Sequence, residues 1–545
     1  MFLSGTVIIV VTTNFFLIQL SPPYNIDSMT YHLARMAYYI QHNNLDYFEA
    51  NYWAQVVHPK NSTILFIYIY LVSGRSENLI QYVQFSSYLI AICSIYLITF
   101  KCWNDKVKSL FAALISALLI EWIMESVTTQ NDMIITALTG CSVYFLISFK
   151  EKLRLLYLVL FILTISIAVG TKFSALMIFP SLLIIFIFPI KQLRQYWNKK
   201  ILYISTISGI IFFSLFTLRS SYWDNYKFFG HPFGPKEVRN EHSFEGKSFN
   251  YIVESGLINV FRYSLDFLSL DGMVTNPIEQ DLLPSNFTIR THFAIKLIPK
   301  LLAKKFELDY NKSENTRVGF FYYKMPTAWE DLSYWGIFGF GLIWISLLFT
   351  LINNKIPLMI RILTIAALLF FIVQCFIGPY DPWRGRYFMA MAIFAVPSSG
   401  LWISTKKIYF NFYLFLIVFI GVISALFSVY YKPNLNILPN NDHEKNYFKK
   451  NRIEQLTIYH PQSKMHLTNF DKIVPKNAIV GVDINGASYE YPLFGVGLTR
   501  KIIPVNKNKN IDKLDYYLYR SYLPYEKNDL YLGDSIYLRN IKINK

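Results

Sequence analysis

Residues 408–431 read IYFNFYLFLIVFIGVISALFSVYY, an apolar run that contains no charged side chain. At a rise of about 1.5 Å per residue, a helix of this length crosses the roughly 30 Å hydrocarbon core of a bilayer. A second uncharged run covers residues 201–218. Both runs predict membrane-spanning helices, and therefore an integral membrane protein.

The composition of the whole chain agrees with this prediction. Of its 545 residues, 53% are hydrophobic and only 16% are charged, against about 25% charged in an average soluble domain. We therefore expect a mainly α-helical protein that crosses the membrane many times. The apolar segments predict about eleven spans, at residues 3–20, 78–100, 109–124, 132–149, 155–169, 174–190, 201–218, 332–352, 356–377, 387–404 and 408–430.

Lysine and arginine gather in every second short loop between these spans. The basic loops in the first half of the chain are 101–108, 150–154 and 191–200. Lys355 and Lys406 mark two more in the second half. Because basic loops face the cytoplasm, the N-terminus is expected inside and the C-terminus outside. The same loops account for much of the net charge of +17, so we expect no nucleic-acid partner.

This orientation divides the chain into a membrane domain and an outer domain. Residues 1–430 form the predicted transmembrane domain, which carries a first outer loop at 21–77 and a large outer loop at 219–331. Residues 431–545 alternate strand-like pieces such as NAIVGVD with helix-like pieces. They predict a small extracytoplasmic α/β domain.

The first outer loop opens with PPYNIDSMTYHLARMAYYIQHNN, residues 22–44. Its apolar residues recur at helical spacing and form one stripe, which consists of Met29, Leu33, Met36 and Ile40. The opposite face carries Asp27, Tyr31, Arg35, Tyr38 and His42. Such a helix is expected to lie flat at the membrane interface. Asp27 has two interpretations. In the first, Asp27 or Ser28 is the N-cap of the helix. In the second, the Asp27 carboxylate accepts a proton at the membrane surface.

Other acidic and histidine side chains stand at the outer ends of predicted spans. In TTQNDM, Asp132 begins the fourth span, and in VVHPKN, His58 opens the helix before the second. Each also has a structural interpretation, because carboxylates commonly cap helices and His58 can mark a plain helix start. These positions alone do not separate the two interpretations.

Basic side chains also occur on the outer side, where the orientation rule gives no reason for them. Lys172 lies in the turn GTKFS, and Arg384 and Arg386 lie in GPYDPWRGRYF. Arginine forks match phosphate oxygens in bidentate geometry, and a phosphate held beside the bilayer indicates a lipid phosphate. The structural alternative is pairing with Asp381 or with lipid headgroups.

Taken in order, the motifs resemble those of the polyprenyl-phosphate-dependent glycosyltransferases of the GT-C class. The resemblance is greatest to bacterial proteins related to glycosyltransferase family 39, the dolichyl-phosphate-mannose protein mannosyltransferases. The matching motifs are DSMTYHLARMAYYIQ, HPK, TQND, GTKFS, GHPFGP, WED and PWRGRYF, spread from about residue 20 to 400. The chain departs from the family pattern at Ala34, Lys60 and Trp329.

The resemblance implies a GT-C-like enzyme of a bacterial cytoplasmic membrane. Such an enzyme moves a hexose or pentose from a polyprenyl phosphate to an extracytoplasmic glycan, lipid or protein, with inversion. It implies Asp27 as the general base and Asp132 as a second acid. Donor phosphate would be bound by Lys172, Arg384 and Arg386. Candidate substrate contacts are Tyr31, His32, Arg35, His58, Glu330 and Asp331. No DxD motif or His/Cys cluster indicates a metal, so we expect neither metal nor cofactor.

Two other functions stay open. A ligase or polymerase of cell-surface polysaccharide also places arginine and a base at the outer face, and it would consume a glycan on a lipid diphosphate. A transporter of lipid-linked saccharides predicts charges or broken helices near mid-membrane, and the sequence shows few such charges. The lipid-linked species that the protein consumes would separate the two enzymes.

Overall fold

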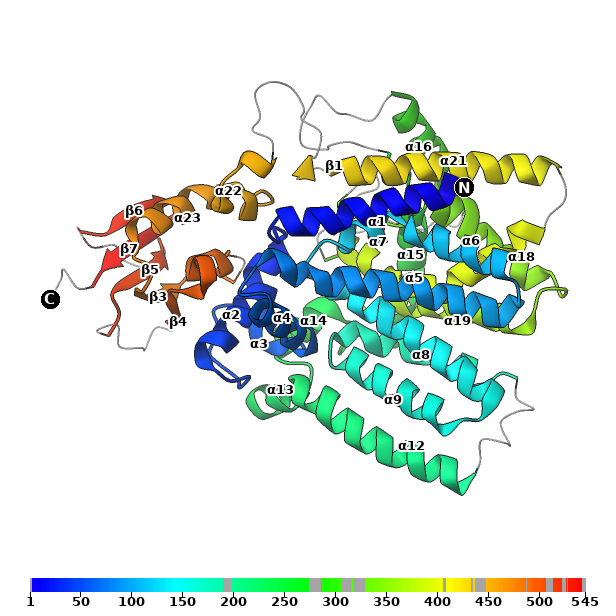
Figure 1. The fold of residues 1–545 in the computed structure, drawn as a ribbon, viewed down its shortest axis with the longest axis horizontal. Helices are drawn as coiled ribbons and strands as arrows, with labels where there is room; N and C mark the ends of the chain where they lie inside the picture. The colour runs from blue at the N-terminus through cyan, green and yellow to red at the C-terminus, as the bar shows by residue number, and fades with distance from the viewer. Residues whose placement is uncertain are drawn as a thin grey trace. The chain divides into compact units, whose positions relative to one another are not determined.

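The computed structural model describes residues 2–189, 198–273, 286–305, 309, 315–317, 329–404, 408–432, 435–436, 447–486, 488–505, 513–521, 526 and 528–541. This part of the chain is mainly helical, with a small sheet near the C-terminus (Figure 1). The predicted cytoplasmic residues Lys191, Arg194 and Lys406 lie outside the described residues.

Long apolar helices form the membrane domain. Within the described residues, six helices are long and apolar enough to cross a membrane. They are α1 (Phe2–Leu20), α5 (Tyr82–Trp103, continuous with a 3-10 turn from Asn78), α8 (Asp132–Lys152), α12 (Lys199–Phe212, continued to Ser220), α19 (Leu358–Phe376) and α21 (Ile408–Tyr430). Helix α9 (Leu155–Val169) packs against both α8 and α12, and the axes of these three helices are roughly aligned (Figure 1). A multi-pass helical membrane protein is therefore confirmed.

The other predicted spans are short or broken. Residues 109–124 were expected to form one span, but the helix breaks at residues 118–119 into α6 (Lys106–Ala117) and α7 (Ile120–Glu125). Three other segments contain 3-10 or π turns, which shorten their α-helical runs. In the first, the 3-10 helix η3 (Phe173–Ile178) precedes α10 (Phe179–Ile187). In the second, the π turn η9 (Gly339–Ile343) separates α17 (Gly336–Phe338) from α18 (Trp344–Ile352), and in the third, α20 (Met391–Ala395) lies between the 3-10 helices η10 (Pro382–Met389) and η11 (Val396–Ser404). The total of about eleven spans therefore stays a prediction.

The large outer loop is also helical where it is described. Its helices are α13 (Tyr222–Phe229), α14 (Lys236–His242), α15 (Phe249–Phe267) and α16 (Asn286–Lys305). Helix α15 packs against α19 of the bundle. Asn259 on α15 donates hydrogen bonds to the backbone carbonyls of Cys375 and Gly378, at 3.0 Å each. These bonds attach the loop to the end of α19.

The chain forms two compact units. The first takes in Met1–Phe15, Gln84–Ser126 and Asn131–Asn440, and it includes a short antiparallel pair of β1 (Tyr431–Lys432) and β2 (Leu435–Asn436). The second unit comprises Phe16–Val83, Val127–Gln130 and Asn441–Lys545. The first outer loop and the C-terminal segment therefore belong to the same unit.

The C-terminal segment contains a five-stranded mixed sheet in the order β4-β3-β5-β7-β6 (orange to red in Figure 1). The central strand β3 pairs in parallel with β4 and β5, whereas β7 pairs antiparallel with both β5 and β6. The elements are α22 (Arg452–Leu456), α23 (Gln462–Ile473), β3 (Ile479–Asp483), β4 (Lys501–Pro504), β5 (Tyr516–Arg520), β6 (Leu530–Gly533) and β7 (Ile536–Asn540). The small C-terminal sheet expected from the sequence is confirmed.

The first outer loop packs against this segment. Its elements are a π turn η1 (Ser28–His32), α2 (Leu33–His42), α3 (Ala54–Val57) and α4 (Asn61–Val72). Met29, Leu33 and Met36 of the expected apolar stripe are buried and Ile40 is half-buried, but Arg35 and Tyr38 on the polar face are buried too. The turn before α4 and the C-terminal segment cover the middle of the polar face, at Arg35 and Tyr38, whereas His42 at its end is exposed. Whether the helix lies at the membrane interface stays a prediction.

Candidate active site

Asp27 lies in the first turn of the helix that leads into η1. The cap of this helix is Asn25, whose side-chain oxygen accepts a hydrogen bond from the backbone N–H of Ser28 at 3.1 Å. Asp27 makes no capping hydrogen bond. Its half-buried carboxylate accepts instead a hydrogen bond from the Tyr31 hydroxyl at 3.2 Å. The capping side chain is therefore that of Asn25, and not that of Asp27 or Ser28.

Aromatic rings surround the Tyr31 side chain. The Tyr31 ring lies 4.2 Å from the ring of His32 and 5.4 Å from that of His58, between centroids. His32 is buried, whereas Tyr31 and His58 are half-buried. The structure thus brings Asp27, Tyr31 and His58 into one polar and aromatic cluster at the start of the outer loop.

Arg35 has a different position from the one expected of a substrate contact. Its guanidinium is fully buried and donates to the backbone carbonyls of His58 and Pro59, at 2.6 and 3.3 Å. It also donates to the Thr63 hydroxyl at 2.5–2.9 Å. Burial lowers the pKa of Arg35. Through these hydrogen bonds, Arg35 connects α2 to the turn before α4 and to the first turn of α4.

A charged cluster lies in the first unit and joins motifs that are far apart in the sequence. Asp132, the first residue of α8, receives the Lys172 ammonium at 2.6 and 2.7 Å from its two carboxylate oxygens. Arg386 Nε lies 4.0 Å from the same carboxylate. Arg386 also donates to Asp331 at 3.0 Å. The TQND, GTKFS, WED and PWRGRYF motifs therefore meet at one site.

All four charged side chains of this cluster are largely buried. The exposed fractions of the Lys172, Asp132, Arg386 and Asp331 side chains are 16%, 3%, 12% and 14%. Because water is largely excluded, their mutual attraction is stronger than that of a surface ion pair. The ion pairs join two cations with two carboxylates, and the buried carboxyl groups of Glu125 and Glu330 lie near them. An additional anion can therefore be accepted only by sharing the two cations.

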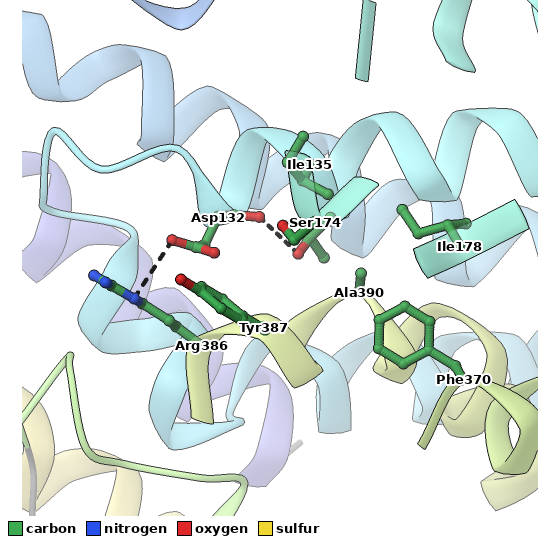
Figure 2. Close-up of a pocket in the computed structure, with 9 residues that line it drawn as sticks. Asp132, Ile135, Ser174, Ile178, Phe370, Arg386, Tyr387 and Ala390 are labelled. Atoms are coloured by element: carbon green, nitrogen blue, oxygen red, sulfur yellow. Dashed lines mark hydrogen bonds and ion pairs between the residues drawn. The ribbon is translucent and has the colours of Figure 1, made fainter. Parts of the chain in front are cut away.

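A pocket adjoins the cluster. Figure 2 shows Arg386 and Tyr387 facing Asp132, with an ion pair drawn between Arg386 and Asp132. Away from these groups the wall becomes apolar, and it is formed by Ile135, Ile178, Phe370 and Ala390. The pocket therefore has a charged end, formed by Asp132 and Arg386, and an apolar wall.

Tyr387 is a site residue that the sequence interpretation missed. Its ring lies 4.3 Å from the Lys172 ammonium and 5.7 Å from the Arg386 guanidinium, which is within the range of cation–π attraction. The signal was present, because this tyrosine directly follows Arg386 in PWRGRYF. Its position next to Arg386 made it a candidate for lining the site, but the direction of its side chain could not be read from the motif.

Arg384 points away from this cluster. Its guanidinium is buried and donates to the backbone carbonyls of Gln374 and His242, at 2.9 and 3.3 Å. Arg384 and Arg386 lie on the 3-10 helix η10. With three residues per turn, side chains two positions apart in such a helix point in different directions. The structure therefore separates two arginines that the sequence had grouped.

Glu330 is buried next to Asp331, with 1% of its surface exposed. Within the residues that the structure describes, no group of three or more His, Cys, Asp or Glu side chains is arranged to hold a metal ion.

Comparison with known proteins gives a family match and a shared fold. Residues 59–218 match the family described as dolichyl-phosphate-mannose-protein mannosyltransferase. The fold is similar to that of ArnT from Cupriavidus metallidurans bound to undecaprenyl phosphate, with a TM-score of 0.53 and 9% identity over 98% of this chain and 97% of that one. The apo structure of the same protein gives a TM-score of 0.52 and 10% identity, with the same coverage. No curated protein sequence matches the chain.

Part of the chain thus matches the mannosyltransferase family, and the chain shares the fold of ArnT. More particularly, the segment that matches the mannosyltransferase family supplies Asp132 and Lys172. At 9–10% identity, the likeness to ArnT shows the fold alone.

Proposed function

We propose that this protein transfers a sugar from a polyprenyl phosphate to an acceptor hydroxyl on the outer side of a bacterial cytoplasmic membrane. The observation that carries the proposal is the buried cluster of Lys172, Asp132 and Arg386 beside a small pocket with an apolar wall. A lipid phosphate has the two matching parts, an anionic head and a hydrocarbon chain. ArnT, whose fold is similar, has been solved with undecaprenyl phosphate bound.

Lys172 and Arg386 are the proposed phosphate ligands. As the bond between the sugar and the phosphate breaks, negative charge develops on the phosphate oxygen, and cations already in place stabilise that charge without reorganisation. Arg386 has several donors in a planar fork, so it can bind a phosphate oxygen while it keeps its bond to Asp331. The apolar wall would face the first isoprenoid units of the lipid once the pocket opens to admit the head group.

Asp132 and Asp331 have a supporting role in this proposal. Two cations buried without counter-charges would repel each other and would be costly to desolvate. The carboxylate of Asp132 receives Lys172 through both of its oxygens, and Asp331 holds Arg386. We assign both acids to positioning the cations, with Asp132 as the more deeply buried partner.

Asp27 is the proposed general base. The acceptor oxygen forms a bond to the anomeric carbon, the bond from that carbon to the phosphate oxygen breaks, and its electron pair stays on the phosphate. The proton of the acceptor hydroxyl passes to the Asp27 carboxylate. The hydrogen bond from Tyr31 fixes the direction of this carboxylate. A single displacement of this kind inverts the anomeric centre.

The purified full-length protein in nanodiscs tests the proposal. It would be given a panel of undecaprenyl-phosphate-linked hexoses and pentoses, together with an envelope extract as the source of acceptor. We expect release of undecaprenyl phosphate and labelling of the acceptor with one of the sugars. Consumption of glycans on undecaprenyl diphosphate instead would identify a ligase or polymerase. Failure to consume either donor would overturn the proposal.

Replacing Arg384 by Met is expected to lower stability rather than donor affinity. The substitution removes the donor to the buried carbonyl of Gln374 and to the partly buried carbonyl of His242. Leaving a buried acceptor such as that of Gln374 unsatisfied costs about 1–3 kcal/mol. Thermal unfolding should therefore begin at a lower temperature, while the folded protein binds undecaprenyl phosphate as the wild type does. A normal unfolding temperature combined with lost affinity would instead assign Arg384 to the phosphate.

A further inference from the structure

Glu490 is a buried carboxyl group in the C-terminal segment, directly before the 3-10 turn η13 (Tyr491–Phe494). Only 1% of its surface is exposed. Its partners all come from the first outer loop, more than 400 residues away in the sequence. Tyr38 Oη donates at 3.0 Å, Asn51 Nδ2 at 2.9 Å and Gln55 Nε2 at 3.0 Å.

The chemistry of this site fits an ionised carboxylate. A carboxylate accepts hydrogen bonds only, and each of these three contacts is a donor. Burial raises the pKa of Glu490, and the hydrogen bonds from Gln55, Asn51 and Tyr38 act in the opposite direction. A buried charge is a weak source of stability, since an apolar side chain of similar size often serves as well. The hydrogen bonds of Glu490 hold three side chains of the first outer loop in place.

The Gln55 side chain connects Glu490 to the segment that bears Asp27. Its Nε2 donates both to Glu490 and to the backbone carbonyl of Thr30, at 2.9 Å for the second bond. Thr30 lies in η1, a π turn, where the wider backbone ring departs from the α-helical hydrogen-bond pattern. One amide group therefore ties the C-terminal carboxylate to the turn between Asp27 and Tyr31.

A second contact leads from the same region of the C-terminal segment to the same turn. Gly486 lies so close to Tyr52 that an added Cβ would meet the Tyr52 ring at 2.5 Å. The Tyr52 ring packs edge-on against Tyr31 at 6.2 Å between centroids. Tyr31 in turn donates its hydroxyl to Asp27. One contact ends at the Thr30 carbonyl and the other at the ring of Tyr31, the residue that bonds to Asp27.

We propose that Glu490 is a positioning residue for sugar transfer, which fixes the Asp27 turn through Gln55. The inference rests on the proposed role of Asp27 as the base. It gives the C-terminal segment a function in the reaction that is distinct from binding either substrate.

The main variants are Glu490→Gln, which keeps the side-chain volume, and Glu490→Ala. Both would remove the ionised acceptor of Gln55 and loosen η1. Since a displacement of about 1 Å can cost on the order of 10²-fold in rate, we expect turnover to fall at least tenfold, with the KM for the polyprenyl-phosphate donor little changed. Hydrogen exchange measured by mass spectrometry should be faster in peptides that cover residues 26–42.

Asp529→Ala is the matched control. The Asp529 side chain is also buried and charged, with 0% of its surface exposed, but it pairs with Arg539 inside the C-terminal sheet. This variant should unfold at a lower temperature, yet leave turnover and the exchange of residues 26–42 as in the wild type. If it reduced turnover as much as the Glu490 variants do, the role of Glu490 would be general stability, and the inference would be wrong.

A double-mutant cycle with Gln55→Leu examines the connection itself. Because Glu490 acts through Gln55, the two substitutions together should reduce turnover no more than the more severe one alone. Additive losses would contradict this route. The failure of the inference is distinguishable from that of the proposed function, because exchange of residues 26–42 is read without any donor. If the wild type transfers sugar and the Glu490 variants transfer it equally well, only the inference is overturned.

Discussion

Replacing Asp27 by Asn is expected to reduce the turnover of sugar transfer by about 10²–10⁴-fold, the usual contribution of a general base. The amide keeps the size of the side chain and can still accept the hydrogen bond from Tyr31, but it cannot take a proton from the acceptor. The protein should fold, insert and bind undecaprenyl phosphate normally. Turnover measured at saturating donor checks the expected loss of rate, and the affinity for undecaprenyl phosphate checks that donor binding is unchanged.

Asp46→Asn provides the control for this variant. Asp46 lies in the same outer loop and is exposed, so the substitution removes the same charge without touching the proposed base. Its turnover should equal that of the wild type. Near-normal transfer by the Asp27→Asn protein would rule out Asp27 as the base.

Replacing Lys172 or Arg386 by Met is expected to weaken the binding of undecaprenyl phosphate by about 10- to 100-fold each, because hydrogen bonds to charged groups contribute about 1.5–3 kcal/mol. The measurement is the affinity of the purified protein for undecaprenyl phosphate. The Lys172→Met variant should also lose stability, because it leaves the Asp132 carboxylate buried without its closest cation.

The double variant Lys172→Met, Asp132→Asn separates these two effects. Removing the unpaired charge should restore much of the unfolding temperature, whereas the affinity for undecaprenyl phosphate should stay low. If affinity returned together with stability, the cation would be structural, and the phosphate would be bound elsewhere.

The sequence predicted the parts of this molecule that depend on local physics. Uncharged runs such as 201–218 and 408–430 correspond to helices long enough to cross a membrane, since length and apolar composition determine that property. The motif around Lys172 and the one around Arg386 were both assigned to basic groups on the outer side, and the structure brings these two side chains to one carboxylate.

Features that depend on backbone detail were not predictable in the same way. Arg384 and Arg386 are equivalent in the sequence, and only the 3-10 path of η10 separates their directions. Asp27 is a good N-cap residue by type, yet Asn25 occupies the capping position. In both cases a shift of two residues along the chain changes the role of a side chain.

Contacts between distant segments left no local signal. Glu490 lies in a short stretch that reads as an ordinary strand-to-turn connection, and its partners Tyr38, Asn51 and Gln55 stand in another part of the chain. A charged residue in a short loop is usually solvated, so its burial could not be expected from composition. The tertiary structure was needed to connect this carboxyl group with the first outer loop.

The most direct test of the central claim is an experimental structure of the full-length protein with bound undecaprenyl phosphate. The account predicts phosphate oxygens within hydrogen-bond distance of the Lys172 ammonium and the Arg386 guanidinium, with the first isoprenoid units against Ile178 and Phe370. A phosphate bound away from both cations would contradict it.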